Sequence, residues 1–117
     1  MDIDELILEA LRAKDYFWFV RYLRIVERTD ATVTLHFIIG PNLLVQIFYS
    51  QRSERLSFAL IVASRRLYGR DREHGYWHRH PFEQPEHHEP NPEGMSPQPV
   101  IQFLAEVEEI LVENDLI

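Results

Sequence analysis

Four long stretches rich in β-branched and aromatic residues fill the middle of this 117-residue chain and constrain its fold more than any other feature. The stretches cover residues 16–28, 31–39, 43–50 and 56–68. The polar breaks between them are short enough to be hairpin turns between antiparallel neighbours. In the second stretch, alternate residues are apolar, which predicts a strand with one face in the core formed by Val33, Leu35, Phe37 and Ile39.

A helix is expected at the N-terminus. Asp2 has the position of an N-cap, and Glu5 three residues later completes a pattern like a capping box. Apolar residues then recur at helical spacing until the helix ends near Lys14.

A second helix is expected at the C-terminus, with Ser96 as N-cap and Pro97 in the first helical position. Its apolar stripe is formed by Val100, Phe103, Leu104, Val107, Ile110 and Leu111. The other face should be solvated and consists of Gln102, Glu106, Glu109 and Glu113. The order of elements predicts one α+β domain over residues 1–117, with an N-terminal helix, an antiparallel sheet of four or five strands in meander order and a C-terminal helix.

The charges of the chain are unevenly distributed. Residues 12–79 contain all 12 Lys and Arg but only six acids, and 11 of those basic residues are arginine. Arginine binds phosphate in a forked geometry, so this imbalance directs attention to a phosphate-bearing partner; alternatively, the arginines simply line the solvated face of a sheet.

The sequence excludes several classes of protein. There are no cysteines, so disulfides and thiolate zinc sites are ruled out. No apolar run approaches the roughly 20 residues of a membrane span, and Met1 is followed by an acidic stretch that does not resemble a signal peptide. We therefore expect a cytoplasmic protein without a membrane partner.

Five of the six histidines lie between positions 74 and 88. If residues 76–80 form a strand, its period of two places His78 and His80 on one face with Tyr76, and Trp77 and Arg79 on the other. Pro81 should end this strand, and Pro85 should turn the chain so that a second histidine pair folds back toward the first. Residues 68–75 are expected to be a polar loop, in which Arg70 and Arg72 either reach a phosphate or pair with Asp71 and Glu73.

Three interpretations of the histidine stretch compete. In the first, His78, His80 and His88 supply the acid and base that cleave a phosphodiester, while arginines bind the phosphate. The RNA-binding candidates are then Arg70, Arg72 and Arg79, together with Trp77, which either stacks a base or belongs to the core. In the second, the histidines bind a metal ion through His78, His80 and His87 or His88, with Glu86 or Glu89 as a further ligand. In the third, the side chains only pack a loop-rich edge.

With these histidine and tryptophan segments the chain resembles a divergent member of the TumE-type toxins of toxin-antitoxin modules. The resemblance covers about the last two-thirds of the chain and is carried by residues 43–45, 68–71, 77–81 and 85–88, the last two reading Trp-His-Arg-His-Pro and Pro-Glu-His-His. It implies a growth-inhibiting protein that acts on RNA and is neutralised by a cognate antitoxin.

We therefore expect a cytoplasmic toxin-like ribonuclease that needs no metal or other cofactor, with RNA and an antitoxin as partners; a homodimer is compatible with this expectation. The alternative is a non-enzymatic module that binds a protein, or a metal ion through its histidines. The two differ in one geometric respect, because the enzyme requires the arginines and the histidine cluster to share one concave surface.

Overall fold

The computed structural model describes residues 1–91, 94–95 and 97–117. The elements in chain order are α1 (Ile3–Tyr16), β1 (Tyr22–Arg28), β2 (Thr32–Gly40), β3 (Leu43–Ser50), β4 (Leu56–Val62), β5 (Arg65–Glu73), β6 (Tyr76–His80), β7 (Glu89–Pro90) and α2 (Pro99–Glu113). The strands form one antiparallel sheet in the order β1 to β7. The α+β class, the meander and the two terminal helices are confirmed, whereas the prediction of four or five strands is wrong because the described residues form a sheet of seven strands.

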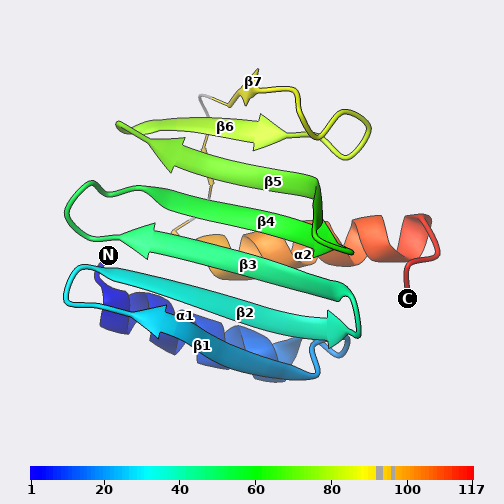
Figure 1. Ribbon diagram of the computed structural model, residues 1–117, viewed down its shortest axis with the longest axis horizontal. Coiled ribbons are helices and arrows are strands. Elements are labelled where there is room, and N and C mark those ends of the chain that lie inside the picture. The colour runs from blue at the N-terminus through cyan, green and yellow to red at the C-terminus, as the bar shows by residue number, and fades with distance from the viewer. Residues whose placement is uncertain (92–93, 96) are drawn as a thin grey trace.

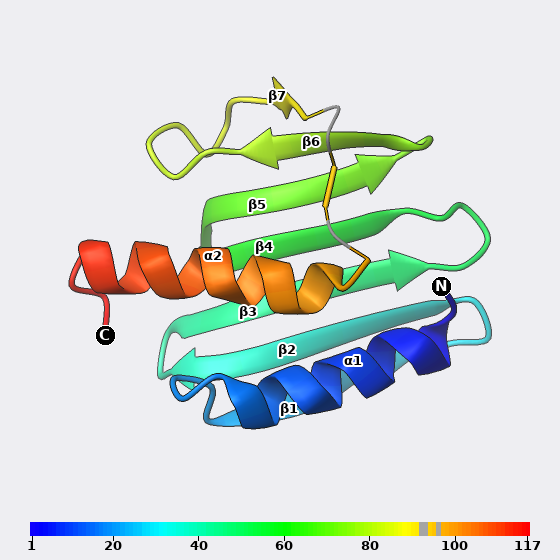
Figure 2. The same cartoon turned by 180° about the vertical axis from the view of Figure 1, so that it is seen from behind.

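Both helices lie on the same face of the sheet, as the two opposite views show (Figures 1 and 2). In Figure 2, α1 lies across β1 and β2, and α2 lies across the middle strands. No helix of the described residues lies on the opposite face, which we call the helix-free face (Figure 1). Since the helices stop short of β6 and β7, this edge of the sheet has neither face covered by a helix.

The core lies between the sheet and the helices. In β2 the residues alternate between buried and half-buried, and Val33, Leu35, Phe37 and Ile39 are the buried ones, as predicted. Phe103 of α2 stacks on Phe58 and Tyr68, with ring centroids 5.0 and 5.5 Å apart, which fixes α2 over β4 and β5.

The strand count was underestimated because one hairpin turn is hidden in the sequence and one strand has only two residues. The stretch 56–68 is interrupted at Ala63 and Ser64, whose φ angles of 49° and 67° place both residues in the left-handed region. This turn normally selects Asn-Gly, so an Ala-Ser pair gives no turn signal. The predicted polar loop 68–75 is instead most of β5 and the next turn, because its charged side chains find partners on both faces of the sheet. The seventh strand is the two-residue β7, in a segment where the prolines predicted irregular chain.

The start of α1 agrees with the prediction better than the start of α2 does. Asp2 is the N-cap of α1 and accepts a hydrogen bond from the Glu5 amide at 2.8 Å, although the helix continues to Tyr16. The predicted N-cap of α2, Ser96, lies outside the described residues, and Pro97 precedes the helix, which begins at Pro99.

The N-terminus of α2 is capped by a side chain from α1. Its N-cap residue, Gln98, makes no side-chain cap, whereas Oε2 of Glu9 accepts a hydrogen bond from the Ile101 amide at 3.1 Å. Burial raises the pKa of Glu9, and the backbone amides of Ile101 and Val100 partly oppose this increase by stabilising the carboxylate. The contact joins the two helices and satisfies an amide that the helix itself cannot.

Candidate functional site

The strand β6 divides the predicted functional residues between the two faces of the sheet. His78 and His80 pair with Asp71 and Gly69 of β5 and lie on the helix-free face. Arg79 pairs with Arg70, whose side chain reaches α2. Arg79 and Trp77 therefore lie on the face of the sheet against which the helices pack, which we call the helix-covered side. The predicted strand 76–80 and its two faces are thus confirmed.

The chain after β6 turns back and brings His88 to the other two histidines. The turn is held by hydrogen bonds from the Gln84 amide to the Pro81 carbonyl and from the His87 amide to the Gln84 carbonyl. The ring of His88 lies 4.2 Å from that of His80 and 5.5 Å from that of His78, between centroids. The three histidines predicted as acid/base candidates therefore form one cluster, the His78–His80–His88 cluster.

His80 is the buried member of this cluster, with 4% of its surface exposed. Its Nε2 lies 2.9 Å from Oδ2 of Asp71, and its Nδ1 lies 2.9 Å from the carbonyl oxygen of Pro85. Both partners are acceptors, so only the imidazolium form donates to both at once. Because both ring nitrogens are engaged, His80 joins β5 to the returning segment, and the accessible imidazoles of the cluster are those of half-buried His78 and exposed His88.

Asp71 connects the cluster to two further side chains. Its Oδ1 accepts a hydrogen bond from the hydroxyl of Ser57, and a guanidinium nitrogen of Arg66 lies 3.7 Å from its Oδ2. The carboxylate thus stands between Ser57 and His80. A Ser-His-Asp hydrolase requires the histidine in that central position, so the arrangement does not activate Ser57 as a nucleophile.

Arg66 is a residue of this site that the sequence analysis missed. A register shift in the pairing of β4 with β5 leaves Leu67 as an extra residue, so that Tyr68 pairs with Leu60 while Arg66 pairs with Ile61. Without this bulge, the strand period would place Arg66 on the same face as Tyr68 and Arg70. The bulge moves its side chain to the helix-free face, where it packs beside Gly69 and pairs with Asp71.

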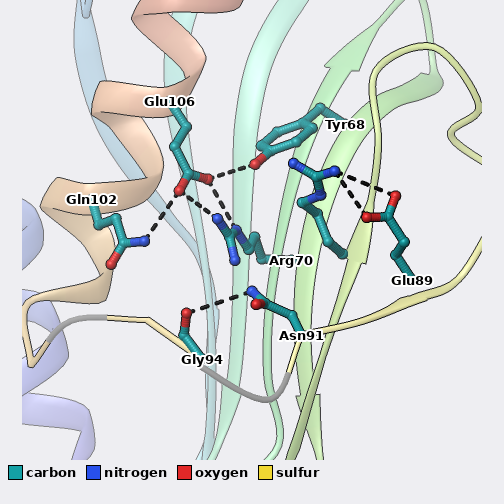
Figure 3. Close-up of polar contacts among 8 residues, drawn as sticks. Tyr68, Arg70, Glu89, Asn91, Gly94, Gln102 and Glu106 are labelled. Carbon is teal, nitrogen blue, oxygen red and sulfur yellow. Dashed lines mark hydrogen bonds and ion pairs between the residues drawn. The ribbon is translucent and has the colours of Figure 1, made fainter.

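On the helix-covered side, Glu106 of α2 is the centre of a separate polar network (Figure 3). It accepts hydrogen bonds from the Tyr68 hydroxyl at 2.6 Å and from two nitrogens of Arg70 at 3.0 and 2.6 Å. Gln102 also donates to it at 3.1 Å. The prediction that Glu106 is solvated is wrong, because it is the counter-charge of a buried arginine.

This network shifts the pKa values of its members. Burial, together with the hydrogen bond to Glu106, raises the pKa of Tyr68 to about 12. Burial is the largest single effect and would lower the pKa of Arg70, but the hydrogen bonding and electrostatic interactions with Glu106 and Tyr68 together outweigh it and raise the pKa. The network therefore holds an ion pair and a neutral phenol that fasten α2 to β5.

The other predicted RNA-binding residues are also engaged on this side. A guanidinium nitrogen of Arg79 lies 3.0 Å from a carboxylate oxygen of Glu89. Arg72 stacks over the ring of Trp77 at 5.5 Å and donates to the backbone oxygen of Glu54. Gly94, which has a φ of 68°, packs against the same ring so closely that a β-carbon there would lie 2.7 Å from it. Arg70, Arg72 and Arg79 therefore do not share a surface with the histidines, whereas Arg66 lies on the same face as the histidines and pairs with Asp71 beside them.

The histidines proposed as metal ligands are not arranged in a way that could hold a metal ion. Across residues 1–91, 94–95 and 97–117, no three His, Asp or Glu side chains are grouped so that they could hold a metal. The exposed side chain of His87 lies outside the ring contacts that join His78, His80 and His88.

Two cavities flank this region. A polar cavity of about 270 Å³ on the helix-covered side includes Tyr68, Arg70, Arg79 and Glu106 in its walls. A larger one, of about 670 Å³, lies at the outer edge of β6 and includes His78. Only the second therefore adjoins the His78–His80–His88 cluster.

Comparison with protein-family models, curated proteins and solved structures finds no match to this chain. In the part that the structure describes, neither helix has the length and apolar character needed to cross a membrane.

Proposed function

We propose that this protein binds single-stranded RNA on the helix-free face of its sheet and cleaves it by histidine acid/base chemistry that needs no metal ion. The observation that carries the proposal is the approach of His78 and His88 from separate segments, with their ring centroids 5.5 Å apart. Imidazole exchanges protons near neutral pH, so two accessible rings can serve as base and acid in one reaction.

In the proposed reaction one imidazole removes the proton from a ribose 2′-hydroxyl. The 2′-oxygen of that ribose then attacks the adjacent phosphorus. The other imidazole protonates the 5′-oxygen that leaves. The bond from phosphorus to the 2′-oxygen forms as the bond to the 5′-oxygen breaks, so the products carry a 2′,3′-cyclic phosphate and a 5′-hydroxyl.

Arg66 is our candidate for stabilising the negative charge that develops on the phosphate. Its side chain is 37% exposed and lies on the same face as the two imidazoles. Its distance of 3.7 Å from Asp71 makes this a loose ion pair, which a phosphate could replace as partner of the guanidinium. Arg72 and Arg79, on the opposite face, would contribute only to the long-range attraction of RNA.

The negative charge of α2 favours the approach of RNA to the helix-free face. The helix α2 carries Glu106, Glu108, Glu109 and Glu113 and has no Lys or Arg. A polyanion is repelled from such a surface, so we assign RNA to the opposite side of the sheet.

The proposal agrees with the resemblance to TumE-type toxins. If the protein is such a toxin, it acts on RNA in the cytoplasm and is neutralised by a cognate antitoxin. The surface bearing His78 and His88 is then the one that the antitoxin would have to cover or distort.

The proposal is tested by cleavage of an end-labelled single-stranded RNA in the presence of excess chelator. Wild-type protein should cleave it, and His78→Ala and His88→Ala should each lose at least 100-fold in rate, as expected for removal of a general acid or base. His87→Ala is the matched control, because His87 is exposed and adjacent to His88 but outside the cluster.

Circular dichroism would confirm that each variant is folded. If wild type is inactive in every condition, the chain is not a ribonuclease by itself. If activity survives in both His78→Ala and His88→Ala, the cleavage does not use this pair.

A further inference from the structure

The larger cavity lies beside the cluster, along the edge of β6 that faces β7. It has a volume of about 670 Å³ and opens between the β5–β6 turn and β7. Its walls are formed by Glu73, His74, Gly75, Tyr76, Trp77, His78, Pro90 and Asn91. The volume lies within the usual range for small-molecule sites, so one nucleoside could enter it.

The walls have the composition of a site for a flat aromatic ligand. Tyr76 is 72% exposed, which leaves its ring available for stacking on the same face as His78. Trp77 comes from the opposite face of β6, but it also lines the cavity because the cavity opens at the edge of the strand. Aromatic side chains arranged around an open space are the usual means of holding an unpaired base.

Polar groups lie at the same cavity. Glu73 supplies a carboxylate, His74 an imidazole and Asn91 an amide, which together offer both donors and acceptors. Such groups can pair with the hydrogen-bonding edge of a base that has been taken out of a stack. The site is therefore suited to a nucleobase better than to a purely apolar ligand.

We propose that this cavity is a base-binding subsite, which holds the unpaired base next to the scissile phosphate. The inference rests on the proposed function and specifies where on the protein the unpaired base is held. His78 belongs both to the cavity wall and to the pair with His88, so a base in the cavity places its own ribose and phosphate beside the two imidazoles. Cleavage should therefore require an unpaired nucleotide at this position.

Binding can be measured separately from cleavage. The chain has two tryptophans, so Trp18→Phe leaves Trp77 as the single fluorescent reporter in the cavity wall. The probe is a single-stranded oligoribonucleotide with 2′-fluoro groups, which lacks the attacking hydroxyl. We expect saturable quenching of Trp77 emission, and the same oligonucleotide in duplex form should quench much less.

Tyr76→Ala in this background should weaken binding about tenfold or more, which is the size of effect expected for loss of one stacked base. Tyr76→Phe keeps the ring and should bind as the parent does. Tyr22→Ala is the matched control, because Tyr22 is also an exposed strand tyrosine, 49% exposed, but lies in β1 at the opposite edge of the sheet.

The outcomes separate the two proposals. Equal binding by Tyr76→Ala and its parent, or no quenching at all, overturns the base subsite, even if wild type cleaves RNA. Weakened binding by Tyr76→Ala, restored by Tyr76→Phe, supports the subsite even if no cleavage is found, in which case the catalytic proposal alone fails.

Discussion

Arg70 and His80 are the two buried polar or charged residues among the described part of the chain, and each is held by a carboxylate from another element. Arg70 pairs with Glu106 of α2, and His80 pairs with Asp71 of β5. A buried charge or imidazole needs such a partner, because leaving it unpaired costs several kcal/mol, on the order of 3–5 for a broken buried ion pair. Both residues therefore stabilise the arrangement around the site and are less free to meet a substrate.

The Tyr68 hydroxyl gives this network a measurable pH dependence. Its pKa rises from 10.0 to about 12 on folding, so the folded protein retains the phenolic proton where the unfolded chain has lost it. The contribution of the protonated Tyr68 phenol to the stability of the fold is fully present below pH 10 and is lost as the pH rises through about 12. We expect the free energy of unfolding to fall by about 3 kcal/mol over this interval, from about 1.36 kcal/mol per pKa unit.

The measurement is denaturant unfolding at several pH values, with Tyr68→Phe as the comparison. The variant has no phenol at this position, so its stability should fall less than that of wild type between pH 10 and 12. Identical pH profiles for the two proteins would mean that the Tyr68 proton is not held by the fold.

Two hairpin turns decide the arrangement of β4, β5 and β6. The first turn consists of Ala63 and Ser64, both with positive φ, and the second contains His74 and Gly75, with φ of 54° and 80°. Only Gly75 is a residue that adopts this region without strain. The Ala63–Ser64 turn is therefore imposed by the pairing of the strands on either side of it.

Replacing this pair by Asn-Gly should stabilise the protein. The double substitution Ala63→Asn/Ser64→Gly removes the strain of two left-handed residues, each costing on the order of 1 kcal/mol. We expect a gain of about 1–2 kcal/mol, seen as a higher midpoint of urea unfolding with an unchanged slope.

The loop between β2 and β3 provides the control. Asn42 is absent from the residues with positive φ, so Asn42→Gly should give no gain and a small loss. A destabilised Asn-Gly variant would show that the strained conformation of the β4–β5 turn is not what limits stability there.

The sheet and the two terminal helices of the molecule could be predicted from periodicity, because β2 alternates and the terminal segments repeat at helical spacing. The faces of β6 could be predicted for the same reason. The position of Arg66 could not, because it depends on the bulge at Leu67. Nor could the partner of Arg70, because Glu106 lies 36 residues away and is brought near only by the packing of α2.

The same packing separates the charges of the molecule. The glutamates of α2 lie on the helix-covered side, whereas the His78–His80–His88 cluster and Arg66 occupy the other. Residues that are neighbours in sequence, such as His78 and Arg79, therefore belong to different surfaces. This separation is why our proposal uses Arg66 and not Arg79 at the reacting phosphate.

The chemistry of the cleaved bond decides whether the ribose 2′-hydroxyl is the attacking group. A single-stranded RNA that wild-type protein cleaves would be prepared with one 2′-deoxynucleotide immediately 5′ of the scissile phosphate, and both RNAs would be incubated with the protein in excess chelator. We predict that the unmodified RNA yields an end with a 2′,3′-cyclic phosphate and that the substituted RNA is not cut at that bond. Equal cutting of both RNAs would contradict attack by the 2′-hydroxyl, and with it the histidine acid/base mechanism proposed for this site.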